Sequence, residues 1–342
     1  PPEGPVGWDA GSTRSRNCNV FYLTLAASTR RHSVFSPRQL LRSAVYMPFA
    51  HIPPGRVVEL PGRGTTYVTD TPGPSESSPA IVLLHALGCT GLLTWYPAIA
   101  PLSERYRVVT LDLRWHGQGI QAPEMSLYDC ADDVAALADV LGIERFVAAG
   151  YSMGGAVAQR VWRQHPDRVE GLVLAATSAV FRFTPWERFF FTGLEAGMIA
   201  ARGISSSRAA MTASRSAARA LHLAPSDIHD WAMQEFRSTS PWAVGQALAA
   251  LGRHHARPWL GRIDVPTAVV VTTGDHVIPP SRQVALARAI PGATMHEVDA
   301  GHASCVMQAE RFVPVMVQAA STVAARRRDF GRHAPVEEPQ QA

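Results

Sequence analysis

The stretch FVAAGYSMGGAVA, residues 146–158, decides the fold. Its first four residues are typical of a buried strand and its last residues of a helix, with Ser152 on a tight turn between them. Residues 150–154 match G-x-S-x-G, a pattern in which a sharp strand-to-helix turn presents a nucleophilic serine. Small residues flank the serine because side chains would not fit in so tight a turn. The pattern alone occurs by chance in roughly one chain of this length in ten, so its surroundings must support it.

Strand-like runs precede and follow this stretch. Two of them enclose a Pro-Gly-Arg-Gly turn, which predicts an antiparallel hairpin over 56–60 and 65–70. The run at 80–84 is wholly apolar, as expected of a strand buried on both faces. Further runs, alternating with helical patterns such as 130–141, lie at 107–111, 146–149, 172–175, 267–271 and 294–298. Such β–α alternation predicts an α/β fold with a mostly parallel central sheet of about eight strands flanked by helices.

The alternation is interrupted once, between about residues 180 and 262. This insert is helical in composition and contains an aromatic cluster: Phe181, Phe183, Trp186, Phe189, Phe190 and Phe191. We expect a helical cap or lid over 180–262, inserted into a core formed by 47–179 and 263–325. The aromatic residues either line the path of a substrate or attach the insert to the core, and the sequence leaves both roles open.

The two ends of the chain differ from this core in composition. Residues 1–46 are expected to be a partly disordered N-terminal extension, with a short helix over 37–46. An apolar run at 20–27 resembles the centre of an export signal but is short, so a cytoplasmic location is favoured over export. Residues 326–342 are expected to be a disordered tail. No apolar run is long enough to span a bilayer.

The composition excludes several kinds of function. The chain has 342 residues, of which 46% are hydrophobic and 18% charged, as is typical of a globular protein. It contains no lysine, which excludes Schiff-base chemistry and a P-loop lysine. Despite a net charge of +4, the arginines are scattered and no basic-aromatic module is present, so no nucleic-acid partner is expected.

The cysteines and histidines do not have the spacing of a metal site. The chain has four cysteines: Cys18, Cys89, Cys130 and Cys305. Since nothing requires them to pair, reduced thiols are expected. Two adjacent histidines, His254 and His255, are interpreted as a surface pair at a helix end. No metal and no cofactor are expected.

Ser152 needs a base, and the base needs an acid to orient it, because a hydroxyl is a poor nucleophile by itself. Asp275 lies just past the predicted strand 267–271, and His302 lies on the loop after 294–298. Both fall at the carboxyl ends of parallel strands, the sheet edge where Ser152 is also expected. The order serine, acid, histidine is the one that accompanies a G-x-S-x-G turn. These three residues are the candidate catalytic residues.

Acyl chemistry also needs N–H donors for a developing oxyanion. The predicted donors are the main-chain N–H groups of Met153 and of Leu87, which lies on the loop after strand 80–84. His85 on the same loop is interpreted as a structural histidine that bridges loops and not as a second base. The candidate residues of the substrate pocket are His85, Trp115, Phe181 and Trp186.

Together these features resemble the α/β-hydrolase superfamily, in its serine esterase and haloperoxidase-like branch with a helical cap. The resemblance extends over about residues 55–325. It rests on the loop 111–119, the serine turn, Gly274-Asp275 and Gly301-His302. Because position 152 is serine and not aspartate, the resemblance argues against epoxide hydrolases and haloalkane dehalogenases and implies acyl chemistry.

The chain departs from the family pattern at Ala86 and Trp115, where members usually have glycine. Ala86 slightly crowds the loop that holds the predicted oxyanion donor. Trp115 places a large ring near the Asp-Arg-His-Gly turn of the loop 111–119. Neither departure removes a catalytic group, so an active enzyme is still expected.

The function expected is hydrolysis of carboxylic esters through a Ser-His-Asp triad and an acyl-enzyme intermediate, as in carboxylesterases and lipases. The aromatic insert favours a fairly apolar acyl group. The same triad could serve a carbon–carbon bond hydrolase or a cofactor-free perhydrolase, and a non-catalytic binding protein of the same fold is the alternative outside enzymes. The expected partner is a small ester-like substrate, and a homodimer is left open.

Overall fold

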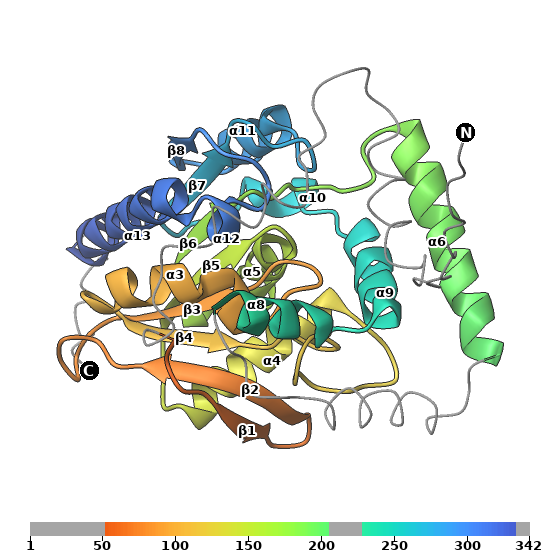
Figure 1. Cartoon of the computed structure of the whole chain (residues 1–342). Coiled ribbons are helices and arrows are strands. Elements are labelled where there is room, and N and C mark those ends of the chain that lie inside the picture. Colours follow the sequence, from red (N-terminus) through yellow and green to blue (C-terminus); the bar gives the residue numbers. More distant parts are fainter. Residues whose placement is uncertain (1–51, 205–227, 333–342) are drawn as a thin grey trace, which may run out of the picture. The chain divides into compact units, whose positions relative to one another are not determined.

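The framework of the protein is an eight-stranded sheet, seen in a computed structural model that describes residues 52–204 and 228–332 (Figure 1). Its strands are β1 (Arg56–Leu60), β2 (Gly64–Thr71), β3 (Ala80–Leu84), β4 (Arg107–Leu111), β5 (Phe146–Tyr151), β6 (Val169–Ala175), β7 (Thr267–Thr272) and β8 (Thr294–Val298). The order in the sheet is β1-β2-β4-β3-β5-β6-β7-β8. β2 pairs antiparallel with β1 and β4, and all other pairs are parallel.

Helices lie on both faces of this sheet (Figure 1). Those of the described residues are α3 (Gly91–Ser103), α4 (Leu127–Val140), α5 (Met153–Gln164), α6 (Pro185–Ile204), α8 (Ile228–Arg237), α9 (Pro241–Gly252), α10 (Arg257–Leu260), α11 (Pro280–Ala289), α12 (Ser304–Met307) and α13 (Ala309–Arg332), with the short 3-10 helix η3 (Pro166–Arg168). The expected α/β-hydrolase fold, a mostly parallel sheet of eight strands flanked by helices, is confirmed.

Two apolar clusters form the core, one on each face of the sheet. Every residue of β5 is buried, and successive side chains point to opposite faces. Phe146 and Ala148 join the cluster that α4, α5 and α11 cover. Val147 and Ala149 join the cluster that α3 and α13 cover. The continuous apolar run of the central strands follows from this burial on both faces.

Between β6 and β7 the chain forms α6, α8, α9 and α10, within the insert expected over 180–262. α6 packs on α9, and α8 packs on α3. Trp231 of α8 meets the ring of Tyr96 of α3 edge-on, with ring centroids 5.0 Å apart. The division into core and cap at residues 179 and 263 stays a prediction.

Two local expectations were wrong. α13 continues to Arg332, so residues 326–332 are helical and do not belong to a disordered tail. His254 is buried, with its ring edge-on to those of Phe181 and Trp259, because the bridge between Val180 and His255 holds this segment against the chain that follows β6. The pair is therefore not a surface pair, although His255 is exposed.

Several expectations fall on residues outside the described ranges. They are the N-terminal extension over 1–46 with its helix at 37–46, the thiol of Cys18, and the part of the tail over 333–342. Within the described residues Cys89, Cys130 and Cys305 are unpaired thiols. Among the helices that the structure describes, none combines the length and the apolar character needed to cross a membrane.

Candidate active site

Ser152 occupies a strained turn between β5 and α5. Its φ of 53° and ψ of −113° lie where residues other than glycine are rarely found. A Cβ atom on Gly150 would lie 2.1 Å from the carbonyl oxygen of Gly154, and one on Gly154 would lie 2.1 Å from that of Leu84. Only glycine fits at either position, which explains the spacing of the G-x-S-x-G pattern.

The chain at the end of β6 holds this turn in place. The main-chain N–H of Ser152 donates to the carbonyl of Ala175 at 2.9 Å. The hydroxyl of Thr177 donates to the carbonyl of Ser152 at 2.7 Å. Both main-chain groups of the serine are thus fixed by the neighbouring strand, which leaves its side chain at the carboxyl edge of the sheet.

The structure brings Ser152, His302 and Asp275 together. The Oγ atom of Ser152 lies 3.0 Å from Nε2 of His302, and Nδ1 of His302 lies 2.7 Å from Oδ2 of Asp275. A carboxylate can only accept, so Nδ1 carries the proton and Nε2 is left to accept one from the serine. Asp275 has no exposed side-chain surface, whereas the side chain of His302 is 21% exposed. The partly exposed imidazole therefore connects a fully buried acid to the hydroxyl of Ser152.

Donors surround the carboxylate of Asp275 on both oxygens. Oδ1 accepts from the main-chain N–H groups of Val277 and Ile278 at 2.8 and 2.9 Å. Oδ2 accepts from the hydroxyl of Thr272 at 2.9 Å and from the amide of Gln283 at 3.2 Å. The sequence interpretation did not include Thr272 and Gln283. A signal for Gln283 was available, since it lies on one helical stripe with apolar residues at the third and fourth positions after it.

The two predicted oxyanion donors lie at a helix start and in a tight loop. Among the residues that the structure describes, no acceptor is recorded for the main-chain N–H of Met153 or Leu87. Met153 is the first residue of α5, where the helix dipole is positive. Leu87 precedes Gly88, whose φ of 76° turns the loop so that Cys89 can donate to the carbonyl of Ala86 at 3.2 Å.

His85 joins two loops at the same edge of the sheet. Its Nδ1 donates to the carbonyl of Ala86 at 2.7 Å, and its Nε2 accepts from the N–H of Leu113 at 2.8 Å. Burial, together with the ring of His116 at 4.9 Å, holds the pKa of His85 well below its ordinary value. Both nitrogens are used by main-chain groups, which is the bridging arrangement interpreted from the sequence and leaves neither free to act as a base.

Trp115 lies in the turn that follows β4. Its φ is 68°, a left-handed conformation that favours glycine and that other residues rarely adopt. The ring is buried, and among the described residues its indole N–H has no acceptor. In the same turn the carboxylate of Asp112 accepts from the N–H groups of Gly91 and Gln118 at 2.9 and 2.8 Å. Burial raises the pKa of Asp112 to about 7.

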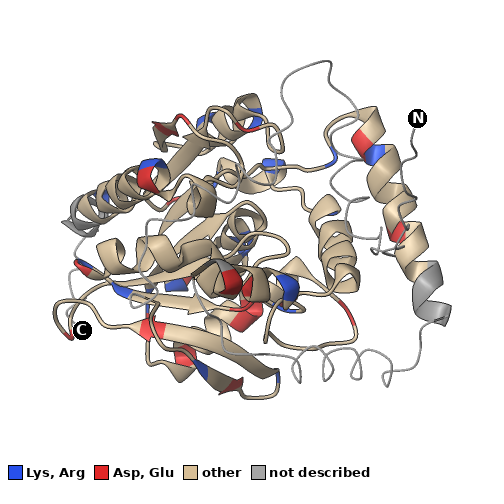
Figure 2. Ribbon diagram, in the orientation of Figure 1, with Lys and Arg blue, Asp and Glu red and all other residues tan. Residues whose placement is uncertain are grey.

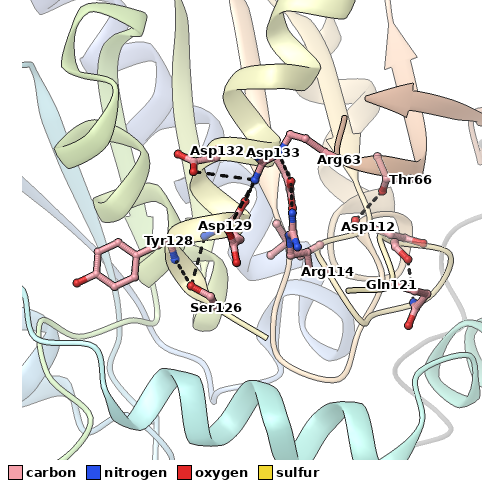
Figure 3. A network of polar contacts seen from close by, with 12 residues as sticks. Arg63, Thr66, Asp112, Arg114, Gln121, Ser126, Tyr128, Asp129, Asp132 and Asp133 are labelled. Carbon is pink, nitrogen blue, oxygen red and sulfur yellow. Dashed lines mark hydrogen bonds and ion pairs between the residues drawn. The ribbon is translucent and has the colours of Figure 1, made fainter. Parts of the chain in front are cut away.

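An ion pair fastens this turn to α4 (Figure 3). The guanidinium of Arg114 donates to both carboxylate oxygens of Asp133, with both side chains buried. Arg63 of the turn between β1 and β2 adds a bond to the same carboxylate at 2.5 Å. The network therefore ties two segments, the β1–β2 turn and the turn after β4, to one aspartate of α4.

The two aromatic pocket candidates of the insert have different surroundings. Phe181 is buried, with its ring 6.0 Å from that of His254. Trp186 is 70% exposed on α6 and stacks on Phe189, with ring centroids 5.7 Å apart. The role of both residues in a substrate pocket stays a prediction.

This fold, with a serine on a strained turn next to a histidine and an acid, defines the class of protein. A family model described as alpha/beta hydrolase fold matches residues 79–307, and the chain belongs to that family. Several of the related proteins are named as hydrolases or esterases, which supports an enzyme of the α/β-hydrolase family.

Three relatives show how far the similarity extends. The chain is 27% identical to 3-oxoadipate enol-lactonase 1 of Acinetobacter baylyi over 254 residues, 74% of this chain and 92% of the relative. It is 29% identical to the pimeloyl (acyl-carrier protein) methyl ester esterase of Chromobacterium violaceum, over 72% of this chain and 96% of the relative. The crystal structure of the enol-lactonase from Burkholderia xenovorans matches with a TM-score of 0.61 and 26% identity, over 78% of this chain and all of the other.

Proposed function

We propose that the protein hydrolyses carboxylic esters of fairly apolar acyl groups, with Ser152 as the nucleophile. The observation that supports this proposal most directly is the line of hydrogen bonds from Ser152 through His302 to Asp275. A serine, an imidazole and a buried carboxylate in this order are what nucleophilic acyl transfer requires.

In the first half-reaction, Ser152 Oγ attacks the carbonyl carbon of the ester while Nε2 of His302 takes its proton. The carbonyl oxygen becomes an oxyanion, which the N–H groups of Leu87 and Met153 stabilise. Asp275 holds the imidazole and balances the charge of the imidazolium. When the carbon–oxygen bond to the leaving group breaks, His302 gives the proton to the alcohol, and the acyl group stays on Ser152.

In the second half-reaction, water replaces the alcohol. His302 Nε2 takes a proton from the water as its oxygen attacks the acyl carbon. Collapse of the second tetrahedral intermediate returns the proton to Ser152 Oγ and releases the carboxylic acid. The same residues thus act in both halves, and no cofactor is needed to balance the reaction.

The preference for an apolar acyl group is supported by α9. This helix contains no charged residue, as its uncoloured ribbon in Figure 2 shows. It lies against the loop of Leu87, because a Cβ atom on Gly88 would lie 3.6 Å from the side chain of Val244. An uncharged helix beside the predicted oxyanion donor offers an acyl chain apolar contacts and no ion-pair partner.

Cyclic esters are a second candidate within this proposal. Two similar proteins are named as enol-lactonases, and a third structure, 26% identical with a TM-score of 0.55, is titled as an enzyme that degrades N-acyl homoserine lactones. A lactone undergoes the same acyl transfer, but its alcohol is part of the acyl group, so deacylation releases a single hydroxy acid.

The proposal is tested with the purified full chain and a panel of substrates. The panel contains p-nitrophenyl esters of increasing acyl length, five- and six-membered lactones, and a vinylogous diketone for carbon–carbon hydrolysis. We expect ester or lactone turnover that Ser152→Ala lowers by a factor on the order of 10⁴ or more. We also expect a fluorophosphonate probe to label Ser152.

A matched control is Ser178→Ala. Ser178 is also buried, and its hydroxyl bonds only to the main chain of Val180. This variant should keep nearly full activity. Undiminished ester turnover in Ser152→Ala would reject Ser152 as the nucleophile, and a folded protein that the probe does not label would favour a non-catalytic binding protein.

A further inference from the structure

α11 buries one polar side chain, Gln283, against the loop that holds Asp275. The side chain has no exposed surface, and the other buried residues of the helix, Leu286 and Ala287, are apolar. A buried amide has two N–H donors and a carbonyl oxygen to satisfy. Its hydrogen-bond partners therefore show what the residue does.

Two main-chain groups determine the orientation of this amide. Its Oε1 accepts from the N–H of Thr272 at 3.0 Å, and its Nε2 donates to the carbonyl of Ile278 at 2.7 Å. In the flipped orientation, two donors would face each other and two acceptors would face each other, so only one orientation is satisfied. The amide thus joins the end of β7 to the far side of the loop and closes this loop around Asp275.

The remaining N–H of the amide faces the carboxylate. Nε2 of Gln283 lies 3.2 Å from Oδ2 of Asp275 and 2.9 Å from the hydroxyl oxygen of Thr272, which itself lies 2.9 Å from the same Oδ2. Oδ2 is also the oxygen that accepts from Nδ1 of His302 at 2.7 Å. One carboxylate oxygen is therefore shared between the imidazole and a pair of neutral donors.

We propose that Gln283 is a positioning residue for the catalytic imidazole and acts on His302 through Asp275. This inference rests on the proposed function. Donors on a carboxylate oxygen hold its direction and withdraw part of its negative charge. Without the amide, Oδ2 of Asp275 loses one of its two neutral donors, is held less firmly and stabilises the imidazolium more strongly, so His302 stays protonated to higher pH. Gln283 touches no substrate.

Two buried titratable groups close to His302 in the fold, Tyr151 and Cys305, are neutral. Tyr151 has its ring centroid 5.9 Å from that of His302, and its hydroxyl donates to the His302 carbonyl at 2.8 Å. Burial raises the pKa of Tyr151 well above its ordinary value. Burial also raises the pKa of Cys305, at the start of α12, from its ordinary value.

The experiment compares Gln283→Met with Leu286→Ala in the full chain. Methionine has a similar length and offers no donor, whereas Leu286→Ala weakens the same helix without changing any polar contact of the loop. We expect Gln283→Met to lower kcat by about tenfold, with KM within about twofold, and to move the acid limb of the pH–rate profile to higher pH. Leu286→Ala should lose stability and keep the wild-type limb.

A second measurement needs no substrate. The pH titration of the His302 imidazole, followed by NMR, should have a higher midpoint in Gln283→Met than in the wild type and in Leu286→Ala. If Gln283→Met does not fold, Gln283→Leu removes the same donor with another apolar side chain and adds no charge beside Asp275. The same shift is expected in that variant.

These measurements separate the inference from the proposed function. If Ser152→Ala keeps its ester turnover, the proposed function is wrong, whatever the Gln283 variants do. If Ser152→Ala is inactive but the Gln283 variants titrate like the wild type, the proposed function stands and the positioning role is wrong. The role is also overturned if Gln283→Met loses kcat while the acid limb of its pH–rate profile stays at the wild-type pH. Gln283 would then be only structural.

Discussion

Gly154 lies so close to Leu84 that a Cβ atom at position 154 would be 2.1 Å from the Leu84 carbonyl oxygen. This contact joins the first turn of α5 to the end of β3, the strand next to β5 in the sheet. The position of Ser152 therefore depends on two neighbouring strands as well as on its own turn.

Gly154→Ala should destabilise the protein severely, because the new methyl group meets main-chain atoms that cannot move without shifting β3. We expect a loss of about 3 kcal/mol or more in the free energy of unfolding, measured by urea denaturation. Gly261→Ala is the control, since nothing lies within 4 Å of a Cβ atom there, and should change stability by less than about 1 kcal/mol. Equal stability of the two variants would contradict the close approach.

Asp133→Ala should also be strongly destabilising, because it leaves Arg114 buried without its carboxylate. Breaking such a pair typically costs about 3–5 kcal/mol. The control Asp139→Ala removes an exposed carboxylate that pairs with Arg168 at 2.7 Å, and should cost no more than about 1 kcal/mol. A small effect at Asp133 would show that Arg114 finds water when its partner is removed.

The hydroxyl of Thr272 is expected to support Asp275 in the proposed reaction. Thr272→Val has nearly the same shape but removes the donor to Oδ2, so kcat should fall about tenfold. Thr272→Ser keeps the hydroxyl and should stay within about threefold of the wild type. The measurement is the steady-state kcat of both variants on one ester. Equal kcat values for Thr272→Val and Thr272→Ser would show that the hydroxyl is dispensable.

Acid should destabilise the fold through three buried histidines, His85, His116 and His254. Burial lowers the pKa of His116 to about 4 and that of His254 to about 3, and the pKa of His85 is also low. The unfolded chain takes up protons at these residues near pH 6.5, whereas the folded chain does not. The free energy of unfolding should therefore fall below that pH, by up to about 1.4 kcal/mol per pH unit for each residue.

Asp112 opposes this trend. Because burial raises its pKa to about 7, its protonation below that pH favours the folded state and offsets the slope of one histidine. Urea denaturation between pH 5 and 8 measures the net slope. His254→Asn should reduce it, while His255→Asn, at an exposed neighbour, should leave it unchanged. Identical slopes in the two variants would contradict the buried, neutral state of His254.

The sequence predicted best what depends on local pattern and on strand order. Ser152, Asp275 and His302 could be found because each follows a recognisable strand, and the carboxyl ends of parallel strands meet at one edge. Gln283 was missed because its side chain enters the site from a helix, where one polar residue among apolar ones has no evident partner until the loop is folded beside it.

The surroundings of the insert were harder to predict. His254 was expected at the surface because two adjacent histidines near a helix end are usually solvated, and its burial depends on a bridge between Val180 and His255 that spans 75 residues of chain. The place of Trp186 in a pocket stays a prediction, because its aromatic character does not show which side of α6 it occupies. The error at His254 concerns a contact between distant segments, which local periodicity does not contain.

The hydrogen bonds between the serine turn and the chain at the end of β6 have a consequence for the order in which helical signal and activity return during refolding. The strained conformation of Ser152 depends on its hydrogen bonds with Ala175 and Thr177, and its histidine and acid follow two still later strands. A chain with its helices and the β1–β2 hairpin formed still has no assembled nucleophile. During refolding, turnover should thus return after the helical signal and together with the pairing of β6, β7 and β8, so recovered activity reports that assembly of the sheet is complete.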